Sequence, residues 1–303
     1  MKNTDLIENE RNVFVNDHQK VRNFKNKLLL VVVVLFSALT AFPIILIVGN
    51  LLVKGYHQIN LAFFTQVPPD TFTAMMAKSS GQIIPGGIVN GITGTILMVG
   101  FASLIAIPFG IMIGIYLYEK KDARYANFVR NITDVLQGVP SIVIGLITYL
   151  WVVISITKGY SALAGSISLS IMMLPLIIRS TEETMKMIPP TLKEAAVALG
   201  TPYHKVIFKV LIPSSLGGLM TGILISISRI LGETAPLLLT ALGNPAVNWK
   251  LSQPTSSVPL LIWQFYNDPN MVSLIFSSSL FLMGFVLTLN LISKRIAAKR
   301  SIQ

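Results

Sequence analysis

Long stretches without charged residues divide this chain of 303 amino acids and limit what it can fold into. Only 12% of its residues are charged, whereas a typical soluble domain has about 25%. Each uncharged stretch holds about 20 residues or more, enough for a helix to cross the roughly 30 Å of hydrocarbon in a bilayer. The stretches are 28–53, 88–118, 135–157, 159–178, 210–228 and 270–293. We therefore expect an all-α polytopic membrane protein with six transmembrane helices.

The basic residues indicate how these helices are oriented. If residues 1–27 lie in the cytoplasm, the inner segments hold 19 Lys and Arg and the outer segments hold four. This asymmetry agrees with the positive-inside rule. We expect a multi-pass membrane protein with both termini in the cytoplasm. The net charge of +11 then reports topology, and no nucleic acid partner is needed to explain it.

The same reading divides the chain into segments. The first apolar stretch is too long for the core of a signal peptide, so it is read as a retained span. There is no cysteine, and the three histidines lie far apart in the sequence, so no metal site is predicted. The predicted segments are a cytoplasmic tail (1–27), a first transmembrane helix (28–53), an extracytoplasmic loop (54–87), a core of five transmembrane helices (88–293) and a second cytoplasmic tail (294–303).

Two pairs of glycines are spaced for close contact between helices. Gly110 and Gly114 lie in the second span, and Gly218 and Gly222 lie in the fifth. Small residues four positions apart let the backbones of membrane helices approach each other. Each pair taken alone is also compatible with chance, because the chain has 21 glycines.

The inner loop at residues 189–213 has the signals of two short helices. Thr191 and Glu194 have the spacing of a capping box. Gly200 follows where a left-handed residue would end the first helix. Thr201 and Pro202 then have the order of an N-cap and a first helical residue, which predicts a second helix.

This loop resembles the EAA loop of permease subunits of ABC importers. The resemblance rests on Glu194-Ala195-Ala196, on Gly200, and on the apolar residues that end at Pro213. It implies the type I permease fold with cytoplasmic coupling helices. It assigns Glu194, Ala195, Ala196 and Gly200 to contact with a groove on a separate ATPase subunit.

The chain contains no Gly-x4-Gly-Lys-Ser/Thr loop that would bind the phosphates of ATP. We therefore expect that it is not an enzyme by itself and needs no cofactor. ATP and Mg would be bound by the partner ATPase.

Two charged residues fall inside an otherwise apolar region. Arg229 and Glu233 are four positions apart, which on a continuous helix would put them on one face as an ion pair. Arg229 would lie about 24 Å along the helix from Pro213, toward its outer half. Arginine suits tetrahedral oxyanions because its guanidinium presents a rigid fork of donors. The alternative is that the pair only fixes helix packing.

Two further residues are candidates for a substrate pathway. Arg179 follows the fourth span near its inner mouth, although an ordinary positive-inside arginine would occupy the same place. Ser141 follows Pro140, where the third helix is expected to break, and its hydroxyl would donate to an anion or simply pack between helices.

Four motifs extend the resemblance to nearly all of residues 28–295. They are Gly86-Gly-Ile-Val-Asn90, Gly138-Val-Pro-Ser-Ile142, Arg179-Ser-Thr-Glu-Glu183 and Gly232-Glu-Thr-Ala-Pro236. The chain resembles the A-type permease subunit of the phosphate-specific (Pst) ABC importer. This implies inward transport of phosphate by a complex with a PstC-like second permease, two PstB-like ATPase subunits and a PstS-like extracytoplasmic binding protein.

Other functions stay open at this point. The arginine and glutamate chemistry does not separate phosphate from phosphonate, sulfate or molybdate, and only the motifs favour phosphate. A secondary transporter or channel is a further alternative, but the EAA-like loop favours dependence on an ATPase. The outer loop, with Phe63, Phe64, Pro68 and Pro69, would contact a binding protein or lie at the membrane interface.

Overall fold

The computed structural model describes the backbone of residues 2–121 and 123–300, and the side chains of 22–121 and 123–296. It divides into two units, Met1–Val53 and Lys54–Gln303. Throughout the described residues the secondary structure is helical, apart from one isolated bridge between Leu242 and Thr255. This confirms the expected all-α class.

The first unit consists of helix α1 (Lys2–Gly55), whose last residues enter the second unit. This helix takes in the polar residues 2–27 as well as the apolar stretch that follows, and it contains Pro43.

The second unit contains the other long apolar helices. Counting α1, five described helices are long and apolar enough to cross a membrane, and a bent pair brings the number to six. This agrees with the six expected spans. In the second unit they are α4 (Val89–Glu119), α7 (Ala162–Lys186), the continuous run of α9 (Tyr203–Val206), the π-helical η3 (Ile207–Leu211) and α10 (Ile212–Ile230), and α13 (Val272–Arg300).

The bent pair contains the third predicted span, and the helix after the bend begins later than the predicted start at residue 135. Helix α5 (Arg124–Gly138) ends at Gly138, and α6 (Ser141–Thr148) continues as the π-helical η2 (Tyr149–Thr157) after a bend of 105°. Val139 is extended, as expected for a residue before proline. The expected break at Pro140 is confirmed, and residues 135–138 belong to α5.

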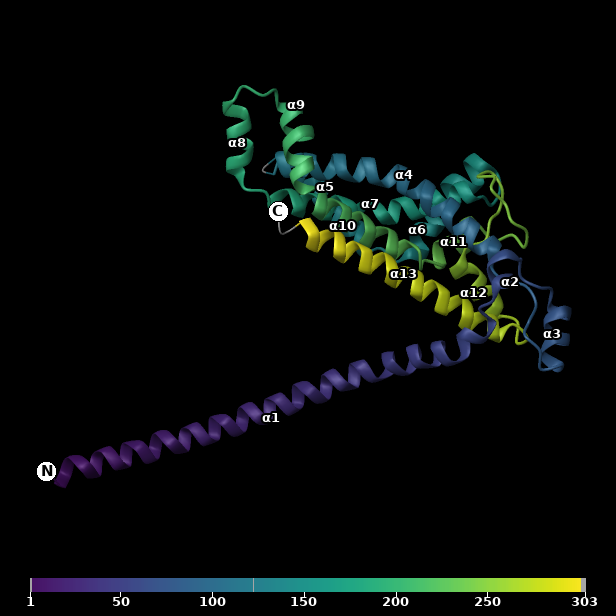
Figure 1. Cartoon of the computed structure of the whole chain (residues 1–303). Helices are drawn as coiled ribbons and strands as arrows, with labels where there is room; N and C mark the ends of the chain where they lie inside the picture. Colours follow the sequence, from purple (N-terminus) through teal and green to yellow (C-terminus); the bar gives the residue numbers. More distant parts are fainter. Residues whose placement is uncertain (1, 122, 301–303) are drawn as a thin grey trace. The chain divides into compact units, whose positions relative to one another are not determined.

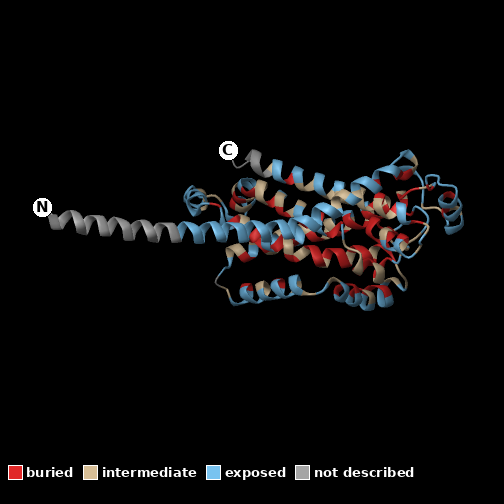
Figure 2. Cartoon of the chain, turned by 90° about the horizontal axis from the view of Figure 1, so that it is seen from below, coloured by how far each residue is buried: buried red, intermediate tan, exposed pale blue. Residues whose placement is uncertain are grey.

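Helix α7 lies at the centre of the second unit, and more than half of its residues are buried. Figure 2 shows buried residues concentrated on the inner helices of this unit. On one side, a Cβ atom on Gly110 would lie 2.7 Å from Cγ2 of Ile177, and one on Gly114 would lie 2.5 Å from Cβ of Thr181. These distances leave no room for a side chain, so α4 approaches α7 through glycine.

The other glycine pair does the same for α10. A Cβ on Gly218 would lie 2.3 Å from Cγ2 of Thr184, and one on Gly222 would lie 1.7 Å from Oγ of Ser180. Both predicted glycine pairs are therefore confirmed as sites of close contact, and α7 is held between them.

The shorter elements gather at the two ends of the second unit (Figure 1). At one end, α8 (Pro190–Ala198) and α9 extend beyond the bundle. We call this the α8 end. At the opposite end, the α3 end, lie η1 (Tyr56–Gln58), α2 (Leu61–Thr65), α3 (Thr71–Ser79), α11 (Ala235–Thr240) and α12 (Val258–Tyr266).

Replacing Gly222 by valine should lower the stability of the chain. The new side chain would collide with Ser180 and force α10 away from α7, and overpacking of this kind costs about 1–3 kcal/mol. The measurement is thermal unfolding of the purified protein in detergent. Gly100→Val is the matched control, because Gly100 is also helical and no atom lies within 4 Å of its added Cβ. Equal melting temperatures for the two variants would contradict the packing described here.

Candidate functional site

Arg229 is the penultimate residue of α10, and its side chain is exposed in the part of the chain that the structure describes. Its neighbours Ser228 and Ile230 are buried. Ile230 packs in the same apolar cluster as Leu169 and Met173 of α7. The helix therefore turns its apolar side to α7 and presents the guanidinium away from it.

The position of Arg229 along the bundle follows from the antiparallel contact of α10 with α7. Gly218 meets Thr184, and Gly222 meets Ser180. Arg229 is seven residues past Gly222, or about 10 Å further along the helix, which brings it to the level of Met173. Met173 is close to the middle of α7. The count from Pro213 put Arg229 toward the outer half of the span, but the helix that carries Arg229 already begins at Tyr203.

The predicted ion pair between Arg229 and Glu233 is wrong. Helix α10 ends at Ile230, and residues 231–234 form a turn in which the amide of Glu233 donates to the carbonyl of Ile230. No ion pair joins Arg229 and Glu233 among the described side chains. The physical reason is Pro236, which lacks an amide hydrogen and whose ring would clash with the carbonyl of Gly232 in a continuous helix.

Arg179 is held by two carboxylates near the α8 end. Its Nε lies 3.3 Å from Oε1 of Glu183, and its Nη1 lies 3.7 Å from Oδ1 of Asp134 on α5. All three side chains are well exposed. An anion approaching Arg179 would compete with these two partners.

Ser141 is half-buried and is the first residue of α6, directly after the break. One turn further along, a Cβ on Gly145 would lie 2.7 Å from Cα of Pro236 at the start of α11. This contact brings the beginning of α6 and the turn with Glu233 into one region. In the described part of the chain, no hydrogen bond or ion pair joins Ser141, Glu233, Arg179 and Arg229 to one another.

The loop at the α8 end has the predicted two helices, and its glycine has the predicted conformation. Gly200 has a φ of +73°. Its amide donates to the carbonyl of Val197, and the amide of Thr201 donates to that of Ala196. These bonds form the Schellman motif, which ends a helix on a left-handed residue and favours glycine there.

Both predicted helix starts in this loop are shifted. Helix α8 begins at Pro190 with Pro189 as its N-cap and no side-chain cap. Thr191 is thus already inside the helix, and the capping box with Glu194 is wrong. Helix α9 likewise begins at Tyr203, one residue later than predicted, with Pro202 as its N-cap. A proline at the first helical position has no amide hydrogen, so one of the N–H groups that would lack a partner at the start of the helix is absent. This explains why α8 needs no threonine cap.

The four residues assigned to the ATPase contact differ in their exposure. Glu194, Ala195 and Gly200 are exposed, whereas Ala196 is half-buried against a cluster with Ile188 and Val206. Glu194 therefore has its side chain free for a partner.

Near the α8 end, Arg130 of α5 connects its own helix to two others. Its Nε donates to Oε1 of Glu182 on α7 at 2.8 Å, and its Nη2 donates to the carbonyl of Leu117 on α4 at 2.8 Å. Lys186 also pairs with Glu182, at 2.7 Å. Glu182 is 1% exposed, so its charge depends on these cations. Sequence reasoning missed this site; the i,i+4 spacing of Glu182 and Lys186 is a signal that could have revealed part of it.

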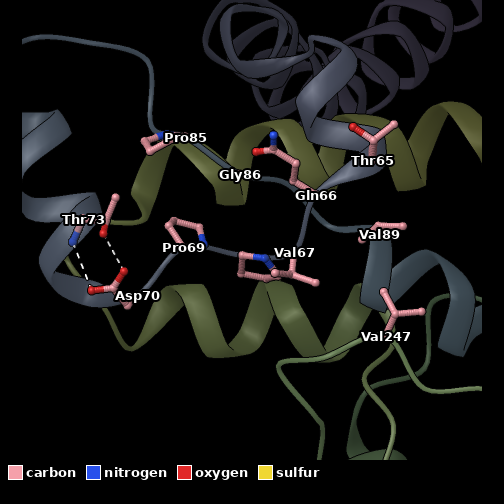
Figure 3. Close-up of a pocket in the computed structure, with 11 residues that line it drawn as sticks. Thr65, Gln66, Val67, Pro69, Asp70, Thr73, Pro85, Gly86, Val89 and Val247 are labelled. Atoms are coloured by element: carbon pink, nitrogen blue, oxygen red, sulfur yellow. Dashed lines mark hydrogen bonds between the residues drawn. The ribbon is translucent and has the colours of Figure 1, made fainter.

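At the α3 end, the structure contains a cavity of about 560 Å³ (Figure 3). Pro68, Pro69 and Asp70 line it, and Val247 reaches it from a distant part of the sequence. Asp70 caps α3, and the hydroxyl and amide of Thr73 that donate to its carboxylate lower its pKa. Phe63, predicted as part of a contact surface, is 0% exposed and belongs to the core.

No group of three His, Asp or Glu side chains that could hold a metal ion occurs among the described residues. The arrangement offers a guanidinium at mid-bundle, a protruding helical loop at one end and a cavity at the other.

Comparison with known proteins gives the family. Residues 106–300 match the family described as "Binding-protein-dependent transport system inner membrane component". The chain is 36% identical over 285 residues to the phosphate transport system permease protein PstA of Yersinia pestis, covering 93% of each chain. It is 33% identical to the PstA of Haemophilus influenzae, covering 90% of this chain and 94% of that one. The chain belongs to the PstA family of transport permeases.

A solved structure supports the fold of this PstA-family chain. A structure of the MetNI methionine ABC transporter in an inward-facing conformation has a chain that matches 70% of this one, with 95% of its own length covered. The TM-score is 0.59 at 21% sequence identity. The type I permease fold and the family resemblance expected from the motifs are both confirmed.

Replacing Arg130 by methionine should destabilise this permease strongly. Among the described side chains, the change leaves the buried carboxylate of Glu182 with Lys186 as its remaining cation. Breaking a buried ion pair costs about 3–5 kcal/mol, and the remaining lysine puts the expected value at the low end. The measurement is thermal unfolding in detergent. Adding Glu182→Gln should recover part of the loss, because the double variant buries no unpaired charge; no recovery would contradict this account.

Proposed function

We propose that this chain is the permease subunit of an ATP-driven ABC importer that carries inorganic phosphate into the cell. The observation that carries the proposal is the similarity to PstA proteins named for phosphate transport, which extends over 93% of both chains in one case. The fold supports the same role, since the chain has the architecture of an importer permease.

The proposed orientation puts the α8 end in the cytoplasm, because the inner segments hold 19 of the 24 basic residues. Residues 1–27 and 294–303 would then be cytoplasmic tails, and 54–87 an extracytoplasmic loop. The core would be residues 88–293, with its coupling loop at 189–213.

The proposed partners follow from this orientation. A separate ATPase, PstB-like and present in two copies, would bind ATP and Mg and receive α8 in a groove. The exposed Glu194 and Ala195 support this, since they face away from the chain. A PstC-like permease would complete the pathway, and a PstS-like binding protein would deliver phosphate at the α3 end. The cavity there, with Pro68 and Asp70, is open to such a partner.

Arg229 is the residue we assign to the anion. A phosphate dianion in a low-dielectric pathway needs a compensating positive charge, and a guanidinium supplies it together with directed donors. Arg229 lies near the middle of the bundle, on a face that the described residues leave exposed. A second permease packed against that face would enclose it. Glu233 follows in the turn that ends α10 and would moderate the charge without holding the guanidinium in a fixed pair.

Ser141 and Arg179 have supporting roles in this proposal. Ser141 begins α6 beside a break in the span and would donate to a phosphate oxygen. Arg179, held by Glu183 and Asp134, would meet the anion nearer the cytoplasm.

Arg229→Gln should abolish phosphate uptake by the complex while leaving its assembly intact. The measurement is uptake of radiolabelled phosphate into vesicles that contain the complex. Arg229→Lys should retain part of the activity, because it keeps the charge and loses the fork of donors. Arg124→Gln is the matched control, since Arg124 is exposed at the first residue of α5. Normal uptake by Arg229→Gln would overturn the assignment.

Gly200→Ala should reduce transport per ATP hydrolysed. Its φ of +73° costs a residue with a Cβ about 1–2 kcal/mol, so the loop after α8 would be distorted. Gly200→Asn should be milder, because asparagine tolerates this conformation better. ATPase activity and phosphate uptake are measured on the same vesicles. If both variants keep the ratio of phosphate uptake to ATP hydrolysis of the original protein, the loop has no coupling role.

A further inference from the structure

A largely buried acidic side chain at the end of α4 contacts α8, the helix that we propose to enter the groove of the ATPase and call the coupling helix. Oε2 of Glu119 accepts a hydrogen bond of 2.6 Å from Nζ of Lys193 on α8, and it also accepts one from the hydroxyl of Tyr203 on α9. The Glu119 side chain is 11% exposed, so water competes little for this carboxylate. One carboxylate therefore joins three helices.

The ammonium of Lys193 is also enclosed by aromatic rings. It lies 5.8 Å from the centre of the Tyr118 ring and 5.3 Å from that of Tyr203. Both distances allow attraction between the cation and the ring faces. Lys193 is thus held by one residue from α9 and by two consecutive residues of α4.

The end of α4 that carries Glu119 is itself anchored. Arg130 donates to the carbonyls of Leu117 and Lys121, which lie on either side of Glu119. The same guanidinium donates to Glu182 of α7. A displacement of Glu119 is therefore transmitted to both α4 and α7, which the glycine contacts already hold together.

The coupling helix has few other constraints on its angle. Pro189 and Pro190 separate it from α7, and Gly200 with its positive φ separates it from α9. Its apolar contact with the bundle passes through Ala196, whose side chain is a single methyl group. Among the described side chains, the link through Lys193 is the polar contact that ties α8 to α4.

We propose that Glu119 is a positioning residue for transport: through Lys193 and Tyr203 it makes the coupling helix move as one body with α4 and α7. The proposal rests on the proposed function, because it concerns how a movement imposed on α8 by the ATPase reaches the spans. It differs from the role of Glu194, which is exposed and available to a partner. Glu119 is internal and acts only within this chain.

The first test measures amide hydrogen exchange of residues 190–199 in the assembled complex without nucleotide. Glu119→Gln and Lys193→Met should each raise exchange in this segment at least 10-fold, and exchanging the two charges (Glu119→Lys with Lys193→Glu) should restore most of the protection. Lys120→Met is the matched control, because Lys120 is exposed beside Glu119. Unchanged exchange in both single variants would overturn the proposal. This readout does not require transport, so it decides the contact even if phosphate is not the substrate.

The second test measures phosphate uptake per ATP hydrolysed in vesicles. Both single variants should lower this ratio at least 10-fold while ATP is still hydrolysed. An unchanged ratio, with the original complex transporting normally, would overturn the proposal. Absence of phosphate uptake by the original complex would instead reject the proposed function.

Because the chain contains no cysteine, a thiol pair gives a further test. The double variant Glu119→Cys with Lys193→Cys should be uncoupled as purified. Joining the two thiols with a short bifunctional reagent should restore uptake, since the proposal requires the two helices to move together. Loss of the remaining uptake on cross-linking would show that the contact has to open, and would overturn the proposal.

Discussion

Close approach of helix backbones around α7 is the constraint on which the rest of this structure depends. In a bilayer, apolar side chains gain little by leaving lipid for a helix interface, so packing and polar contacts must hold the helices together. Gly110 and Gly114 bring α4 against one side of α7, and Gly218 and Gly222 bring α10 against the other. These contacts set the register that puts Arg229 at mid-bundle, and they hold the helix whose end brings Glu119 next to α8.

Three of the four candidate pathway residues lie where helices are interrupted, whereas Arg179 lies inside α7. Ser141 follows the break at Pro140, and Arg229 and Glu233 lie on the two sides of the turn between α10 and α11. Within a membrane, irregular backbone is tolerated only where it is buried in protein or lines a polar cavity. The breaks thus agree with a pathway at these positions, and they free Arg229 from the pairing that a continuous helix would impose.

The α8 end combines an exposed surface with an internal polar network. Glu194 and Ala195 face outward, whereas Glu119, Lys193 and Arg130 connect the loop to α4 and α7 behind them. The loop that resembles the family's EAA loop was evident from its motif, because the spacing of Glu194, Gly200 and Pro213 is local. Its internal connection was not, since Glu119 and Lys193 are 74 positions apart and neither belongs to the motif.

The sequence by itself determined the class, the number of spans and the two-helix loop at residues 189–213 of this protein. Those features follow from local properties: the length of uncharged stretches, the freedom of Gly200 to adopt a positive φ, and the break imposed by Pro140. Only the tertiary structure decided that Arg229 and Glu233 do not pair with each other, that Phe63 is buried, and that Glu182 and Glu119 hold the α8 end together. The reason is that these properties depend on which helix faces which, and a periodic apolar pattern specifies a buried face without specifying its neighbour.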